Sequence, residues 1–185
     1  NNIETIGLYA YLQRIPFYER IQFKYFSEFV RMKGTGISVS AKTPIRKASQ
    51  KDLQDIIDLD QHTFGVSRRS LLDSIFNEKS NLCYVSKDNT RVLGFIMAKV
   101  YNEMAEIGPL VCIEGRDYIA INLIKTILRM LRNYEIFLCI PTRESRILKT
   151  LKRLGFKEDF RLAKMYHGPS ISSNNIYLAE SLERG

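Results

Sequence analysis

The chain has 185 residues, of which 45% are hydrophobic, and it carries a formal net charge of +8. This composition excludes a disordered chain, and no apolar run approaches the roughly 18 residues that a membrane-spanning helix needs. The excess of positive charge suits a polyanionic ligand, either a phosphorylated cofactor or a nucleic acid, but a solvated basic surface without a partner explains it equally well.

The cysteines and histidines argue against a metal site. Cys83, Cys112 and Cys139 each lie within an apolar run that is typical of a strand, which predicts buried thiols in a reducing, cytoplasmic setting. The N-terminus has no signal-peptide pattern. His62 and His167 lie too far apart in the sequence to form a recognisable zinc motif with these cysteines, so no metal is expected.

The first part of the chain reads as a strand over 6–12, a short helix with Pro16 in its first turn, and a strand over 24–32. Residues 33–43 are rich in glycine and hydroxyl side chains, which is typical of a linker. A surface loop inside one domain would have the same composition. We prefer a domain boundary, because a new pattern of elements begins directly afterwards.

From residue 44 the pattern predicts alternating strands and helices. Ser49 has the features of a helix N-cap, and Asp52 stands at the position from which a side chain can return to it in a capping box. Strands are predicted at 44–48, 82–86, 92–101, 104–113, 135–140, 156–166 and 175–180, and helices after Ser49 and at 67–78, 117–131 and 143–154. This order predicts a mixed α/β domain of the α+β type.

One predicted strand is interrupted. Gly108–Pro109 lies inside the apolar run 104–113. Proline cannot donate a hydrogen bond to a sheet, so the break predicts a bulge at this point.

The chain also contains an internal repeat. Residues 18–32 match residues 151–165 without a gap, with Arg20 and Phe23 opposite Arg153 and Phe156. Both stretches read as a helix end followed by a strand, which indicates two copies of one unit. We therefore predict that residues 1–34 are the strand-helix-strand tail of a first unit, 35–43 a linker, and 44–185 a complete domain.

The order of elements, with a broken strand feeding a helix, resembles the GNAT superfamily of N-acetyltransferases. The segments that support this resemblance are DQHTFG, GFIMAKV, EIGPLVC, LKRLGF and the closing IYLAESLERG. Their order and spacing are most similar to the C-terminal part of tandem-GNAT acetyltransferases. The resemblance implies an acyl-CoA N-acyltransferase fold preceded by the tail of another GNAT-like unit.

The same resemblance implies acetyl-CoA as co-substrate and an amine acceptor, either a small molecule or a protein. In this fold the bulged strand splays from its neighbour, and its free backbone groups bind the pantetheine arm. Leu110, Val111 and Cys112 would supply these groups, although Gly108–Pro109 could instead only bend the strand. The following loop and helix N-terminus would bind the pyrophosphate through residues that include Gly115, Arg116 and Ala120.

The resemblance also suggests catalytic and acceptor-binding residues. Glu106 and the nearby Glu103 are candidate bases or simply solvated acids at a strand edge. Tyr18, in the first repeat, stands where the family has a tyrosine that reprotonates the leaving thiolate, but it is equally a packing residue.

Asp60 and Arg68 would bind a charged acceptor or pair with each other. In the second repeat the tyrosine position is Leu151, and Tyr118 replaces a family glycine in the pyrophosphate loop.

Two classes of function therefore stay open. One is a catalytic N-acetyltransferase. The other is a non-catalytic GNAT-like domain with a degenerate CoA site that serves structure, ligand sensing or dimerisation, and a homodimer is compatible with it. The basic face of the helix at 143–154 lacks aromatic interleaving and any known module, so no nucleic-acid partner is expected.

Overall fold

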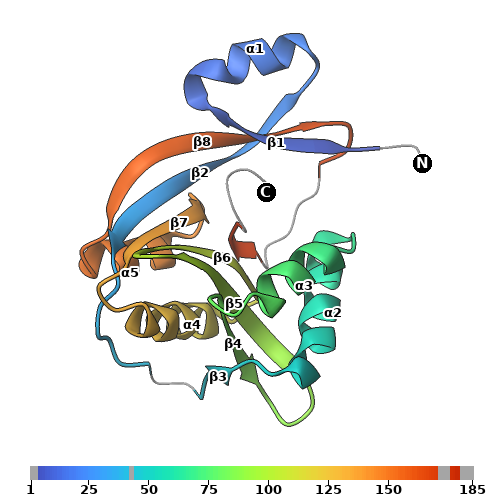
Figure 1. Cartoon of the computed structure of the whole chain (residues 1–185). Coiled ribbons are helices and arrows are strands. Elements are labelled where there is room, and N and C mark those ends of the chain that lie inside the picture. Colours follow the sequence, from blue (N-terminus) through green and yellow to red (C-terminus); the bar gives the residue numbers. More distant parts are fainter. Residues whose placement is uncertain (1–3, 42–43, 171–175, 180–185) are drawn as a thin grey trace.

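The computed structural model describes residues 4–41, 44–170 and 176–179. Its centre is one mixed β-sheet in the order β1-β8-β2-β7-β6-β5-β4-β3, with β9 paired to β6 (Figure 1). Helices α2 and α3 lie on one face of the sheet, and α4 and α5 lie on the other. The predicted mixed α/β class and the predicted order of elements from residue 44 are confirmed.

The bounds of the elements follow the predicted ranges closely. Within the described residues the strands are β1 (Ile6–Tyr11), β2 (Lys24–Thr35), β3 (Arg46–Lys47), β4 (Leu82–Lys87), β5 (Val92–Tyr101), β6 (Met104–Cys112), β7 (Glu135–Pro141), β8 (Lys157–His167) and β9 (Ile176–Leu178). The α-helices are α1 (Ile15–Arg20), α2 (Leu53–Phe64), α3 (Arg69–Asn77), α4 (Asp117–Met130) and α5 (Ser145–Arg153), and short 3₁₀ turns precede α1 (η1, Leu12–Arg14) and α2 (η2, Gln50–Asp52).

Successive side chains of the central strands point to opposite faces of the sheet and so contribute to two hydrophobic cores. In β5, Phe95 and Met97 pack against the side of α2 and α3, whereas Ile96 and Ala98 belong to the core under α4. This is the period of two that a strand covered on both faces must have.

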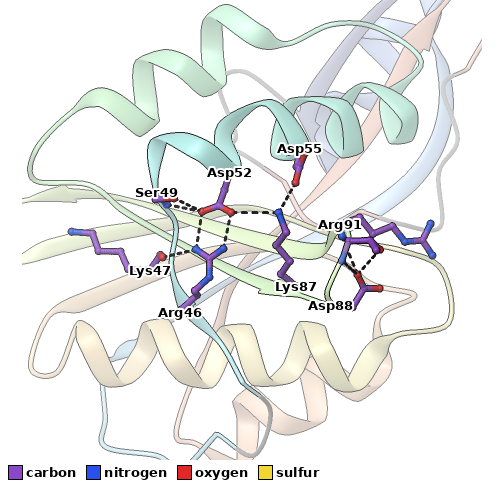
Figure 2. Close-up of polar contacts among 9 residues, drawn as sticks. Arg46, Lys47, Ser49, Asp52, Asp55, Lys87, Asp88 and Arg91 are labelled. Carbon is purple, nitrogen blue, oxygen red and sulfur yellow. Dashed lines mark hydrogen bonds and ion pairs between the residues drawn. The ribbon is translucent and has the colours of Figure 1, made fainter.

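The predicted capping box is confirmed at the start of α2. Ser49 donates to Asp52 Oδ2 from its backbone nitrogen at 2.8 Å and from its hydroxyl at 2.7 Å. Arg46, on β3, donates to both carboxylate oxygens of Asp52 at 2.7 Å (Figure 2). Lys87, on β4, bonds Asp55 at 2.8 Å beside them. These contacts join the edge strand, the neighbouring strand and α2.

Strands β1 and β2 belong to the same sheet as the later strands of the described chain. Strand β2 lies between β7 and β8, and β1 pairs with the outer edge of β8. Helix α1, which connects β1 to β2, lies at this outer end of the sheet (Figure 1). The predicted boundary therefore falls within one continuous sheet.

The two copies of the sequence repeat are neighbouring strands, and their register is symmetric. Phe29 and Leu162, which occupy equivalent positions in the repeat, pair with each other. Lys24 pairs with Tyr166. At the other end of the ladder Lys33 pairs with Lys157, and these two residues are the repeat equivalents of Tyr166 and Lys24. A local two-fold axis thus passes between β2 and β8.

The glycines that suggested a linker have a packing role. Strand β2 continues to Thr35, and the Gly36 N–H donates to the Tyr134 carbonyl at 3.0 Å. A Cβ atom on Gly36 would overlap the Leu131 carbonyl oxygen. Glycine at this position allows two backbone segments to approach closely.

Candidate functional site

Strand β6 has an irregularity in its pairing with β5 at Gly108–Pro109, where the sequence predicted a bulge, and there it also separates from β7, as the family resemblance implied. The two strands pair in parallel from Met104–Glu135 to Ile107–Leu138, and the pairing stops just before Gly108–Pro109. Beyond that point β6 and β7 are not paired with each other, and we call the space between them the slot. Strand β6 ends at Cys112, and the loop that follows it leads into α4.

The slot contains the chain's own last strand. Leu110 pairs with Leu178 of β9, and Val111 pairs with Ile176. On the other side the Ala179 N–H donates to the Cys139 carbonyl of β7 at 3.0 Å. The predicted pantetheine-binding residues Leu110 and Val111 therefore lie at the slot, and their edge of β6 is paired with β9. Of the predicted strand 175–180, residues 175 and 180 lie outside the described part of the chain.

The predicted pyrophosphate loop lies where expected, before α4. Gly115 has a left-handed φ of 73° with open space around it, and Ala120 is fully buried. Arg116 donates to the Tyr118 hydroxyl at 3.1 Å, and the Tyr118 side chain is exposed. Cys112, the third predicted pantetheine residue, is buried in the core under α4.

A carboxylate already stands at the N-terminus of α4. Asp117, in its first turn, accepts a hydrogen bond from the Tyr177 hydroxyl at 2.9 Å. Arg146 of α5 lies 3.3 Å from the same carboxylate. The positive end of the helix dipole is thus next to an acid of the protein itself.

The sequence patterns did not indicate two ionisable groups, Tyr177 and Glu144, as candidate site residues. Burial, and then the hydrogen bond to Asp117, raises the pKa of Tyr177. Burial also raises the pKa of Glu144, which precedes α5. The apolar pattern around Tyr177 predicted a strand but gave no sign of which element it would pair with.

Asp60 and Arg68 adopt the ion-paired arrangement that the sequence left open. Arg68 Nη2 lies 2.6 Å from Asp60 Oδ1, and its Nε lies 3.0 Å from Oδ2. The Asp60 side chain is 0% exposed, and the guanidinium lies 3.5 Å from the centre of the Phe64 ring. The pair fixes the end of α2 and the position of Phe64.

The two catalytic candidates lie on different elements, α1 and β6. Glu106 is on β6 and forms an ion pair with Lys99 at 3.0 Å, and Glu103 precedes the same strand. Tyr18 is on α1, where its ring packs beside Phe17 and Phe23. Leu151, at the corresponding position of the second repeat, is fully buried in the core under α4. The fold does not bring Glu106 and Tyr18 together at one centre.

A pocket opens on the α2 side of the slot. Its empty space measures about 470 Å³ including the open mouth. Aromatic and cationic residues dominate its wall, and two apolar residues come from β9 (Ile176) and from the position just after it (Ala179). The lining residues are Tyr9, Phe26, Ser27, Phe29, Phe64, Arg143, Lys164, Tyr166, Ile176 and Ala179. Nothing in the sequence indicated this pocket, because its residues come from six separate segments.

Lys164 is the most unusual residue in this pocket. Its Nζ lies 4.1 Å from the centre of the Tyr9 ring and 5.5 Å from that of Tyr166. Burial, assisted by the positive charge of Arg68, lowers the pKa of Lys164 from 10.5 to about 8. A lysine in this state can bind an anion or exchange a proton near neutral pH.

The cysteines are buried thiols, and burial raises the pKa of Cys83 and of Cys139 to about 12. Among the described residues no group of three histidine, cysteine or acidic side chains could hold a metal ion. In that part of the chain no helix is long and apolar enough to cross a membrane.

Comparison with known proteins identifies a family. The family model described as "Acetyltransferase (GNAT) domain" matches residues 56–178, more than half of the chain. No curated protein matches the chain.

Several solved structures share the fold. An acetyltransferase candidate from Pyrococcus horikoshii is 19% identical with a TM-score of 0.78, and the match covers 100% of this chain and 61% of that one. A GCN5-related N-acetyltransferase from Sphaerobacter thermophilus is 17% identical (TM-score 0.65, 92% of this chain, 62% of that one).

A GNAT-family acetyltransferase candidate from Novosphingobium aromaticivorans is 15% identical (TM-score 0.63, 92% and 76%). The chain thus spans less than two thirds of the length of the first two structures.

Proposed function

The chain belongs to the GNAT acetyltransferase family, and from this premise we propose that it transfers an acetyl group from acetyl-CoA to an amine acceptor. The observation that supports this most directly is the separation of β6 from β7 at Gly108–Pro109, beside the N-terminus of α4. The slot accepts an extended chain with backbone amides, since β9 pairs there. A pantetheine arm is also an extended chain with amides.

The cofactor would use the backbone of Leu110, Val111 and Cys112 along the slot. Arg116 would pair with a phosphate, and Gly115 and Ala120 would allow the loop and the helix start to approach it. When bound, acetyl-CoA supplies the activated thioester. In the described arrangement the slot does not fit the cofactor, because β9 is bonded to the same edge of β6.

The acceptor would lie in the pocket beside Lys164. Aromatic rings suit an apolar or planar body, and Lys164 and Arg143 suit a negative group such as a carboxylate. We therefore propose an acceptor amine that also carries an apolar group and a carboxylate. Asp60 and Arg68 would contribute indirectly, by holding Phe64 in the wall.

Transfer requires a free amine, so a base must remove a proton from the ammonium group. The amine nitrogen then bonds to the acyl carbon as the carbon–sulfur bond breaks. CoA leaves as a thiolate, which takes up the second proton that the nitrogen loses on forming the amide. Glu106 is the candidate base. Its neighbours Ala105 and Ile107 lie in the core under α4, so alternation turns Glu106 to the opposite face of the sheet. Glu106 does not line the pocket itself.

We further propose that the chain is the C-terminal part of a tandem-GNAT protein. The symmetric register of β2 and β8 supports two related units that share a sheet. In this proposal residues 1–34 are the tail of a first unit, and Tyr18 would act as the acid of that unit.

A non-catalytic GNAT-like domain is the second candidate function. It is favoured by the presence of β9 in the slot, by Asp117 at the start of α4 and by Leu151 in place of a tyrosine. Such a domain would serve structure, ligand sensing or dimerisation.

Calorimetric titration with acetyl-CoA separates the two candidates. Binding, together with acetyl-CoA-dependent release of free thiol when carboxylate-bearing amines are added, is expected for the enzyme. Lack of binding at millimolar acetyl-CoA, both for the full chain and for a chain that ends at Ser170, would exclude the enzyme and leave the second candidate.

A further inference from the structure

We propose that β9 is an internal competitor that must leave the slot before acetyl-CoA can bind. The inference rests on the proposed function, because it assumes that the slot is a cofactor site. It extends that function by giving residues 176–179 a role in controlling access to the slot.

The first argument is that a strand edge can form only one set of hydrogen bonds. One edge of β6 pairs with β5 along most of its length, from Tyr101–Met104 to Gly94–Cys112. The other edge pairs with β7 only as far as Ile107, and beyond the break it pairs with β9. A pantetheine arm that used Leu110 and Val111 would need the edge that β9 already uses.

The second argument is that β9 also fills the end of the slot at α4. The Tyr177 side chain is 2% exposed, and its hydroxyl bonds Asp117 in the first turn of the helix. Leu178 is fully buried in the core under α4. Release of β9 would free the strand edge and remove Tyr177 from the first turn of α4, where Asp117 and its partner Arg146 would remain.

The third argument comes from what β9 separates. Ile176 and Ala179 form part of the wall of the Lys164 pocket, while Tyr177 and Leu178 face the core under α4. The strand, which occupies the proposed cofactor slot, thus closes it off from the proposed acceptor pocket. Its departure would join them, as transfer from one ligand to the other requires.

The position of β2 in the sheet explains why β9 pairs with β6 and not with β8. In the outer sheet β2 already occupies the position between β7 and β8, and β1 occupies the far side of β8. One edge of β8 is therefore paired with β2 from Lys157 to Tyr166, and the other is paired with β1 from Leu162 to His167. The C-terminal segment pairs instead with the free edge of β6.

The test compares acetyl-CoA affinity in the full chain and in two variants that weaken β9. Leu178→Asp places a carboxylate in the core and should expel the strand, and a chain ending at Ser170 lacks it altogether. Only molecules in the open state can bind, so the apparent affinity increases as the open fraction increases. Both variants should be open more often and should therefore bind acetyl-CoA at least about tenfold more tightly than the full chain. Met130→Asp, at an exposed position outside the slot, is the matched control and should bind as the full chain does.

Hydrogen exchange read by mass spectrometry gives a second, independent readout on the unaltered chain. Saturating acetyl-CoA should speed amide exchange in residues 176–179 and leave residues 110–112 protected. Equal affinity in the full chain and both variants, or a saturated complex in which 176–179 stay protected, would overturn the inference and leave the proposed function standing. Failure of the full chain and both variants to bind acetyl-CoA would overturn the proposed function as well.

Discussion

Lys164 shows how a single side chain can identify a site that the sequence does not. Most lysines remain in water, whereas Lys164 lies among the rings of Tyr9 and Tyr166 and has a lowered pKa. Retaining a positive charge in such surroundings lowers stability, and residues that do so are concentrated at functional sites.

Replacing Lys164 by Met should therefore stabilise the protein. Below pH 8 the lysine is charged in both states, and the folded state bears the full penalty of burying it. As the pH rises from about 8 towards 10.5, the unfolded chain holds more protons and the wild-type protein recovers stability. We expect a gain of about 2 kcal/mol at pH 7 that disappears above pH 10, measured by urea unfolding at several pH values. A variant less stable than wild type at pH 7 would contradict this.

Asp52 is the opposite case, a buried charge that stabilises the fold. The hydrogen bonds from Arg46 are the main cause that holds the pKa of Asp52 well below its ordinary value of 3.8. A lowered pKa contributes stability that is present above about pH 4 and is lost as the pH falls further.

Asp52→Asn should lower the free energy of unfolding by about 2 kcal/mol at pH 7, because Arg46 loses its ionic partner while remaining half exposed. The difference from wild type should shrink below pH 4. Chemical unfolding followed by circular dichroism at pH 7 and pH 3 measures both effects. Asp58→Asn, on the exposed side of the same helix, is the control and should change stability by less than about 0.5 kcal/mol.

At the scale of elements, the junction after β2 depends on a close backbone approach. Gly36 lies against the Leu131 carbonyl where the chain leaves α4, and it also bonds Tyr134. The contact fixes the end of β2 to the segment between α4 and β7. The glycine is needed for its small size.

Gly36→Ala should destabilise the protein by at least about 2 kcal/mol, since the added methyl group has no room without moving the backbone. Gly65→Ala is a suitable comparison, because Gly65 has a left-handed φ of 71° but open space around it. That variant should lose only about 1 kcal/mol through backbone strain. Thermal unfolding of both variants measures the difference. Equal losses would mean that the close approach at Gly36 is not a constraint.

At the scale of the whole molecule, the sheet is made by two segments that the sequence separates. Strand β2 provides the neighbour that β7 and β8 both need, so the predicted domain 44–185 would lack the centre of its outer sheet. The unpaired edges of β7 and β8 would then be free to associate with other chains.

A protein consisting of residues 44–185 alone should therefore fail to form a stable monomer. We expect aggregation or a sloping, non-cooperative thermal transition, whereas the full chain unfolds cooperatively. Size-exclusion chromatography and thermal unfolding would show this. A monomeric and cooperative 44–185 would mean that β2 is an addition to a self-sufficient domain, as the linker interpretation supposes.

Much of the fold could be predicted because it depends on local patterns. The order of elements from residue 44, the capping box of Ser49 and Asp52 and the break at Gly108–Pro109 all follow from neighbouring residues. Such features depend on helical and strand periodicity, on capping and on proline's missing donor, and each is encoded within about a dozen residues.

The site could be predicted only in part, for a physical reason. The sequence by itself determined that β6 breaks and feeds α4, and the family resemblance added where a slot would lie. It could not determine that β9 fills the slot, that Asp60 pairs with Arg68, or that Lys164 lies among aromatic rings.

Those outcomes depend on which distant segments share an edge or a face. That choice is set by competition among strands for free hydrogen-bonding edges, which only the complete tertiary structure decides.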